Sequence, residues 1–360
     1  MHEAICLPSL LLHEHSSQEE AFECAALGIS YERTDPFIRG VVALAAQELE
    51  QKGAPFPFVL LSTCNRLEIY YSTKEWAEAY HFFFTFMQSR VPSLASWHWD
   101  SYFGQACLAH LIGVVSGVKS ANLFETEIKA QTKEAYARAQ EKRILSKELH
   151  FLFQQAFFVA KKIRLHFGLE KMGRSLGGLV QEAAKNHFCH IEEVSLLFVG
   201  ASWINRQILS SLPLHLLKRV ALCSRSPERA KRWIRSYTGA GDGRAIVEIP
   251  WDDQYLWSQF DWLIFGTKSS RYLLSSVTDW PKGPLPKLIC DLSIPQNVNP
   301  IVGASFHLLN IDQILEKTAE QTSHIALKQT ILAHIQTRAH NCLEKFVPSS
   351  ISLPEKKPFF

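Results

Sequence analysis

The pattern of apolar and polar positions changes character near residue 175. Before that point, short apolar runs at 58–61 and 67–71 predict two strands, which flank the polar turn 62–66. From residue 107 to about residue 167, apolar residues recur at helical spacing, which predicts helices with one buried face. We therefore expect the first part of the chain to form an α+β domain.

Beyond residue 175, apolar runs alternate with helical patterns. Helices are expected at 175–187, from Gly200 to about 212, and at 227–237. The expected strands are 194–199, 219–223, 245–249, 260–266 and 287–292. This alternation predicts a doubly wound parallel sheet of the Rossmann type, so the fold class is α/β with more than one domain.

A last helical pattern covers 312–346 and is followed by the tail 347–360. The patterns together predict an N-terminal α+β domain at 1–165, a Rossmann-like domain at 166–311 and a long C-terminal helix at 312–346. A chain of 360 residues is long enough for two such domains.

Composition narrows the classes of partner. The 38 Lys and Arg residues against 35 Asp and Glu give a net charge of +3, so any nucleic-acid surface must be a local patch. No apolar run reaches the ~18 residues that cross a bilayer, so we expect no membrane contact and a cytoplasmic location. The eight cysteines form no C-x-x-C pair, which favours free thiols in a reducing compartment and no metal site.

A candidate dinucleotide site lies where the strand 194–199 meets the next helix. A G-x-G-x-x-G fingerprint would stand here, but only its first glycine, Gly200, is present. Gly200 can make the tight turn, and the helix N-terminus behind it can attract a pyrophosphate. Ala201 follows, Ser202 and Asn205 occupy the other glycine positions, and a purely structural strand–turn–helix is the alternative.

The strand 219–223 is followed by Ser224, Arg225 and Ser226. An arginine with hydroxyl neighbours at this point favours a 2′-phosphate, and therefore NADP over NAD. The alternative is that Arg225 is a solvated surface charge.

Cys64 is the candidate nucleophile because it stands in the polar turn, two residues before Arg66. A nearby guanidinium can lower the pKa of a thiol and favour the reactive thiolate. The alternative is a small buried hydrophobic residue.

Several segments together resemble the glutamyl-tRNA reductase family. The strongest is Leu61-Ser62-Thr63-Cys64-Asn65-Arg66-Leu67-Glu68-Ile69-Tyr70. The others, in the same order as in the family, are 110–120, 125–136, 153–156, 160–164, 291–295 and 310–312.

The resemblance implies that NADPH reduces the glutamate carried by glutamyl-tRNA to glutamate-1-semialdehyde, the first step towards 5-aminolevulinate and tetrapyrroles. It implies that Cys64 attacks the ester and forms a thioester, which accepts hydride more readily than an ester does. It also implies that His110 gives a proton to the departing ribose oxygen, for which an ordinary pKa near 6.5 is suitable.

The same resemblance implies the residues that hold the substrate. Arg66 suits the side-chain carboxylate and Glu68 the α-ammonium group. The further positions are Thr63, Asn65, Ser120, Glu125 and Gln131. A local basic patch for tRNA is expected from Lys129, Lys133, Lys142, Arg143, Lys161, Lys162 and Arg164.

The resemblance also implies a homodimer, and it raises docking of the downstream glutamate-1-semialdehyde aminomutase. The dimerisation region, however, is shortened, because fewer than 50 residues follow Asp312.

Two departures from the family pattern affect the cofactor domain. A non-glycine residue in a left-handed turn at the fingerprint is expected to cost roughly 1–2 kcal/mol. Gln296 stands where the family usually has an arginine. The alternatives to a reductase are therefore a Cys64-dependent esterase of glutamyl-tRNA and a non-catalytic tRNA-binding protein.

Overall fold

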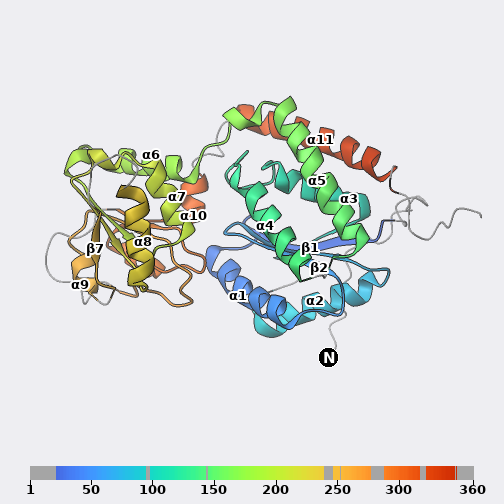
Figure 1. The fold of residues 1–360 in the computed structure, drawn as a ribbon, viewed down its shortest axis with the longest axis horizontal. Helices are drawn as coiled ribbons and strands as arrows, with labels where there is room; N and C mark the ends of the chain where they lie inside the picture. The colour runs from blue at the N-terminus through green and yellow to red at the C-terminus, as the bar shows by residue number, and fades with distance from the viewer. Residues whose placement is uncertain are drawn as a thin grey trace, which may run out of the picture.

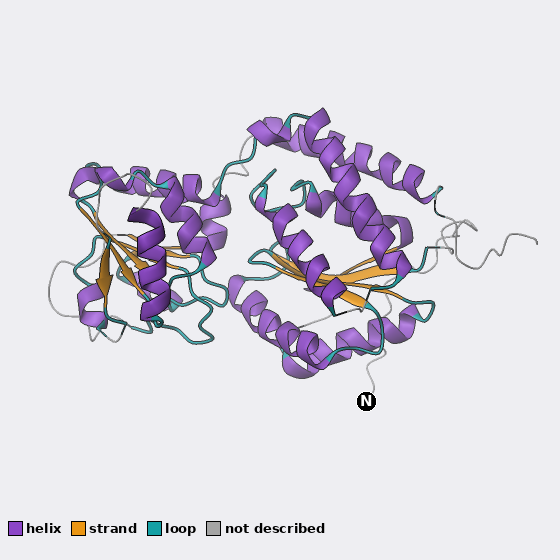
Figure 2. Cartoon of the chain, viewed as in Figure 1, coloured by secondary structure: helices purple, strands orange, loops and turns teal. Residues whose placement is uncertain are grey.

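The computed structural model describes residues 22–94, 98–142, 145–238, 246–251, 253–276, 288–316, 322–344 and 346. In the described part of the chain, helices flank two separate sheets (Figure 2). The predicted tail 347–360 lies outside the described residues.

The first sheet is antiparallel and has the strand order β2-β3-β1-β4. Its strands are β1 (Cys24–Ser30), β2 (Phe58–Ser62), β3 (Arg66–Ser72) and β4 (Asp100–Phe103). Helices α1 (Pro36–Lys52) and α2 (Trp76–Arg90) cover one face. Helices α3 (Gly104–Val115), α4 (Glu127–Glu141) and α5 (Lys147–His166) cover the other (Figure 1).

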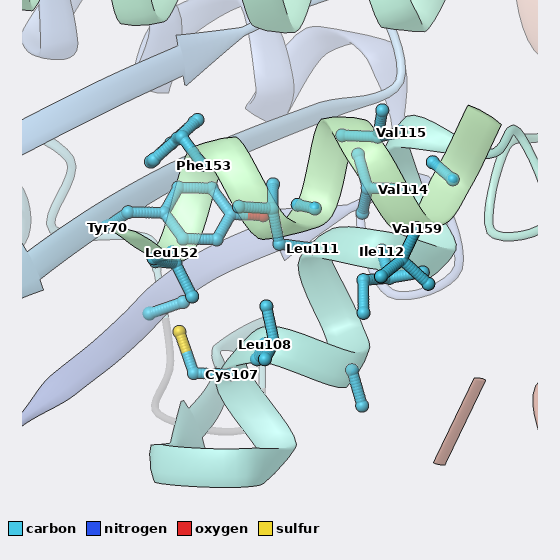
Figure 3. Packing of buried hydrophobic residues seen from close by; sticks show 14 of the residues in the cluster. Tyr70, Cys107, Leu108, Leu111, Ile112, Val114, Val115, Leu152, Phe153 and Val159 are labelled. Carbon is cyan, nitrogen blue, oxygen red and sulfur yellow. The ribbon is translucent and has the colours of Figure 1, made fainter. Parts of the chain in front are cut away.

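The alternation of side chains along β3 decides which face receives which residue. Leu67, Ile69 and Tyr71 pack with α1 and α2. Tyr70 packs with α3 and α5, where Figure 3 shows it beside Phe153, Leu152 and Leu111. Arg66 and Glu68 have the same parity as Tyr70, so they also belong to the α3 side of the sheet.

The second sheet is parallel throughout, with the order β10-β9-β8-β5-β6-β7. Its strands are β5 (Ser195–Val199), β6 (Arg219–Cys223), β7 (Val247–Ile249), β8 (Trp262–Phe265), β9 (Leu288–Asp291) and β10 (His307–Asn310). Counted from β5, this is the Rossmann order 3-2-1-4-5-6, with the switch point between β5 and β8. The predicted fold class is confirmed.

Several helices of the described part of the chain pack on the apolar residues of this sheet. They are α6 (Leu176–His187), α7 (Trp203–Ser211), α8 (Pro227–Thr238) and α10 (Ile311–Glu316). The short helix α9 (Gln254–Trp257) lies on the opposite face, where Trp257 is buried. Continuous burial on both faces explains why the sequence shows these strands as uninterrupted apolar runs.

The helical pattern predicted at 312–346 corresponds to two helices, α10 and α11 (Thr322–Leu343), and residues 317–321 lie outside the described residues. The two pack on different domains. Ile314 of α10 is buried with the parallel sheet, whereas Ile331, Ile335 and Ala339 of α11 are buried with α3 and α5 (Figure 1). Much of the apolar face of α11 is therefore covered by its own chain.

Helices α1 and α4 of the first domain contact the domain of the parallel sheet. Arg39 Nη2 lies 2.5 Å from Asp312 Oδ1. A Cβ atom on Gly40 would lie 2.5 Å from the Cα atom of Pro295, so only glycine allows α1 to approach this loop so closely. Glu127 Oε1 accepts a hydrogen bond from Gln207 Nε2 at 2.7 Å, which joins α4 to α7.

Candidate active site

The turn between β2 and β3 is held by Thr63. Its Oγ1 accepts hydrogen bonds from the backbone amides of Asn65 and Arg66, both at 3.2 Å. The Thr63 amide donates to the Arg66 carbonyl at 2.9 Å. These bonds place half-buried Cys64 at the tip of the turn.

Cys64 packs against the apolar cluster of the parallel sheet, and its carbonyl accepts a 2.8 Å hydrogen bond from Arg39 Nε. Burial raises the pKa of the Cys64 thiol to about 12, Glu125 adds to this rise, and Arg39 opposes it. The expectation that Arg66 lowers this pKa is wrong, because the guanidinium of Arg66 is bound to Glu68 instead.

A buried cluster of charges forms beside the turn. Glu68 Oε1 lies 2.7 Å from Arg66 Nη1 and 2.8 Å from His110 Nε2. The Tyr70 hydroxyl donates to Glu68 Oε2 at 2.5 Å, and Arg66 Nη2 donates to the Lys119 carbonyl. Burial would raise the pKa of Glu68, but Arg66 and then His110 outweigh it and hold this pKa well below its usual range.

The His110 ring is buried and neutral near pH 7. Burial, aided by Lys119 and Arg66 and opposed by Glu68, lowers its pKa to about 4. The expectation of an ordinary value near 6.5 is therefore wrong. Lys119 Nζ lies 2.9 Å from His110 Nδ1, and Tyr102 stacks on the ring with 3.8 Å between centroids.

A cavity of about 230 Å³ opens over this cluster. Its lining residues are Ala26, Gly28, Ile29, Ser30, Glu32, Arg66, Glu68, Asp100, Tyr102, His110, Lys119, Lys328 and Leu332. Three of these lining residues were not predicted from the sequence, namely Tyr102, Lys119 and Lys328. Lys119 lies in the segment 110–120 that resembles the family, so its place near the site could have been inferred. Nothing in the sequence relates α11 to this cavity.

Of the candidate substrate ligands, Arg66 and Glu68 line this cavity. The lining contributed by the described residues does not include Cys64, nor the candidates Thr63, Asn65, Ser120, Glu125 and Gln131. Ser120 is buried, and Gln131 is half-buried on α4. Glu125 follows Phe124, which has a left-handed φ of 66°. Burial raises the pKa of Glu125 to about 7, with Ser120 opposing the rise.

The fingerprint turn after β5 is not strained. Gly200 has φ 102°, and a Cβ atom there would lie 2.6 Å from the Gly266 carbonyl oxygen, so glycine is required. Ser202 is extended (φ −88°, ψ 167°) and caps α7, its side chain accepting from the Asn205 amide at 3.2 Å. Asn205 Nδ2 donates to the Val199 and Gly200 carbonyls at 3.1 and 2.8 Å. The expected strain energy of a non-glycine residue in a left-handed conformation is therefore wrong for this turn, because the residue with a positive φ is Gly200 itself.

The loops after β5 and β6 lie side by side, because the Gly200 amide donates to the Cys223 carbonyl at 2.7 Å. Arg225 is exposed, and half-buried Ser224 accepts a 3.3 Å hydrogen bond from the Ser226 amide through its hydroxyl. A backbone turn, a helix N-terminus and an exposed guanidinium thus gather at the switch point, where dinucleotides bind in this fold.

The basic patch is only partly available to a ligand. Arg164 is buried and its Nη1 donates to the carbonyls of Ser116, Phe124 and Glu125 at 2.9 to 3.1 Å, so its role in the patch was predicted wrongly. Arg143 lies outside the described residues. The exposed members are Lys133, Lys142, Lys161 and Lys162, and Lys129 is half-buried.

The described residues contain neither a group of metal ligands nor a membrane-spanning helix. No group of three or more His, Cys, Asp or Glu side chains in this part of the chain is arranged to hold a metal ion. None of the helices within it is long and apolar enough to cross a membrane.

Comparison with known proteins gives two successive family matches. Residues 27–166 match the N-terminal domain of glutamyl-tRNA(Glu) reductase, and residues 182–317 match shikimate/quinate 5-dehydrogenase. A glutamyl-tRNA reductase of Teredinibacter turnerae is 28% identical over 306 residues, which cover 81% of this chain and 72% of the relative.

Solved structures to which the chain shows similarity include glutamyl-tRNA reductase from Methanopyrus kandleri, at 19% identity and a TM-score of 0.42, covering 90% of this chain and 79% of that one. Another is Δ1-pyrroline-2-carboxylate reductase from Thermococcus litoralis in complex with NADH and L-proline, at 11% identity and a TM-score of 0.30, covering 46% and 64%. The family matches follow the two domains in order and one relative spans most of the chain, so the chain is similar to glutamyl-tRNA reductases along both of its domains.

Proposed function

We propose that the protein uses NADPH to reduce the glutamyl group of glutamyl-tRNA to glutamate-1-semialdehyde through a thioester on Cys64. The observation that carries this proposal is a buried Arg66–Glu68–His110 cluster beside a cysteine-bearing turn. The cysteine packs against the domain whose fold binds dinucleotides, so acyl capture and reduction can take place at neighbouring positions.

The charges of the cluster match those of a glutamyl group. At neutral pH this group has a side-chain carboxylate and an α-ammonium group. Arg66 can receive the carboxylate and Glu68 the ammonium, so substrate replaces one ion pair by two complementary contacts. Thr63, Asn65, Ser120, Glu125 and Gln131 are proposed to complete the binding site around the acyl group.

Cys64 is proposed as the nucleophile. Its Sγ forms a bond with the acyl carbon, the bond to the ribose oxygen breaks, and that oxygen takes a proton supplied through His110. Since the pKa of the thiol is about 12, nearly all of it is protonated near pH 7, and its proton must pass to water as the attack occurs.

The residues at the switch point fit NADPH. Gly200 and the N-terminus of α7, capped by Ser202, would hold the pyrophosphate, while Ala201 and Asn205 shape the turn. Arg225, flanked by Ser224 and Ser226, would hold the 2′-phosphate. When bound, NADPH supplies the hydride that reduces the thioester to the aldehyde and releases the Cys64 thiolate.

Lys133, Lys142, Lys161 and Lys162 are proposed to contact tRNA phosphates, because they are exposed on or next to α4 and α5. We also propose a cytoplasmic location, a homodimer and contact with the downstream aminomutase, all three supported by the family resemblance.

Replacing Cys64 by Ser should abolish semialdehyde formation, with a fall of at least about a thousandfold, because the alcohol is a far weaker nucleophile than the thiolate. Labelled glutamyl-tRNA is incubated with and without NADPH and the products are separated. The exposed Cys189→Ser variant is the matched control and should retain activity.

In the same assay, free glutamate as the product despite NADPH would identify an esterase. Undiminished tRNA binding with no acyl adduct, in wild type and Cys64→Ser alike, would identify a non-catalytic binding protein.

Alkylation of Cys64 by iodoacetamide should accelerate about tenfold for each pH unit between about pH 7 and about pH 9. Only the thiolate reacts, and burial places the pKa of this thiol far above that range, at about 12. Peptide mass spectrometry gives the rate at Cys64. A plateau near neutral pH would show instead that the thiol is activated in the free protein.

Replacing Arg225 by Ala should raise the KM for NADPH about ten- to a hundredfold and change the KM for NADH little, because only NADPH has the 2′-phosphate. Initial rates with each cofactor measure the effect. Arg229→Ala, at an exposed position on α8, is the control. Equal losses with both cofactors would contradict the role given to Arg225.

A further inference from the structure

Lys119 reaches His110 by crossing the surface of α3 at a glycine. A Cβ atom on Gly113 would lie 3.2 Å from Lys119 Cγ and 3.3 Å from Lys119 Cδ, closer than side chains normally pack. The missing side chain therefore leaves room for the lysine stem. At the end of that stem, Lys119 Nζ lies 2.9 Å from His110 Nδ1 and 4.8 Å from the centre of the Tyr102 ring.

This contact fixes which nitrogen of His110 carries the proton. An ammonium group has only donors, so Nδ1 must accept from it. The proton of the neutral ring is then on Nε2, where it is donated to Glu68 Oε1 at 2.8 Å. Tyr102 stacks on the ring at an angle of 18° and holds its plane.

A neutral imidazole is a poor acid, because loss of its single N–H proton leaves an anion. The loss becomes feasible when the other nitrogen gains a proton at the same time. Lys119 is the group placed to supply that proton, since its ammonium already points at Nδ1.

We propose that Lys119 is a positioning residue that feeds a proton to His110 Nδ1 while His110 Nε2 protonates the departing ribose oxygen. The idea rests on the proposed function. As the bond between acyl carbon and ribose oxygen breaks, the Nε2 proton leaves its hydrogen bond with Glu68 Oε1 and passes to that oxygen, and a Lys119 proton passes to Nδ1. His110 is left neutral in its other tautomer, and Lys119 is left as a neutral amine.

The surroundings of Lys119 make this transfer easier. The groups that face it come from every element around the cavity: Glu32 after β1, Arg66 and Glu68 on β3, Asp100 on β4, His110 on α3 and Lys328 on α11. Burial lowers the pKa of Lys119, Glu68 opposes this, and Arg66 reinforces it. A lysine that gives up its proton more readily is a better proton source near neutral pH.

Two variants separate proton supply from simple packing. Lys119→Arg keeps a cation with donors for Nδ1 but cannot release a proton. Lys119→Met keeps the stem and removes a charge that adds to the effect of burial in lowering the pKa of His110, so the imidazolium forms at a higher pH and can act as the acid itself. Lys74→Met, at an exposed lysine that is not among the residues lining the cavity, is the control.

The experiment is single-turnover deacylation of glutamyl-tRNA by the full chain without NADPH, at about pH 6 and about pH 8, corrected for spontaneous hydrolysis. Lys119→Arg should lose about a hundredfold in rate at both values. Lys119→Met should lose as much at pH 8 but recover much of the wild-type rate at pH 6. Lys74→Met should match the wild type.

Nitrogen-15 spectra of His110 provide a readout that does not require substrate. The wild type should show the Nε2–H tautomer and Lys119→Met a mixture of tautomers. The relay alone is overturned if the Lys119 variants are active and their deacylation rates depend on pH as the wild-type rate does. It is also overturned if the His110 ring of the wild type is protonated on Nδ1. A wild type that forms no glutamyl adduct at all overturns the proposed function, and the relay with it.

Discussion

The site depends on the buried carboxylate of Glu68, whose negative charge the surrounding side chains must compensate. Glu68 lies on the α3 face of the antiparallel sheet and is 4% exposed, a position where an unpaired charge would cost several kcal/mol. Arg66, two residues away on the same strand, supplies the compensating charge, and His110 and Tyr70 occupy further acceptor positions. The orientation of each of these groups follows from the need to satisfy Glu68.

The backbone makes room for this arrangement at two glycines. Gly28 of β1 pairs directly with Glu68 of β3, and a Cβ atom there would lie 2.7 Å from Glu68 Cγ. Gly113 allows the Lys119 stem to cross α3 in the same way. The result is an open cavity over the charged side chains, and Lys328 and Leu332 of α11 line one side of it. The distance along the chain between these parts shows that the site forms only when the whole N-terminal domain and α11 have packed.

Local patterns predicted some of these features and could not predict others. The Rossmann-like strands were predictable because parallel strands buried on both faces read as apolar runs. β1 was missed because Cys24-Ala25-Ala26-Leu27-Gly28 has few residues typical of strands, although every residue of β1 is buried. The turn at 62–66 was predicted from its polarity, and its cysteine and arginine from a motif. That Arg66 binds Glu68 rather than acting on Cys64 depends on strand alternation and tertiary packing, which the motif does not contain.

The direct test is a double-mutant cycle on the free energy of unfolding with Arg66→Met, Glu68→Gln and the double variant, measured by denaturant titration. Each single change leaves a buried polar or charged partner uncompensated and should destabilise by about 3–5 kcal/mol. The double variant should lose less than the sum by at least about 2 kcal/mol. Strict additivity of the two changes would show that Glu68 does not depend on Arg66, and would contradict the account of the site.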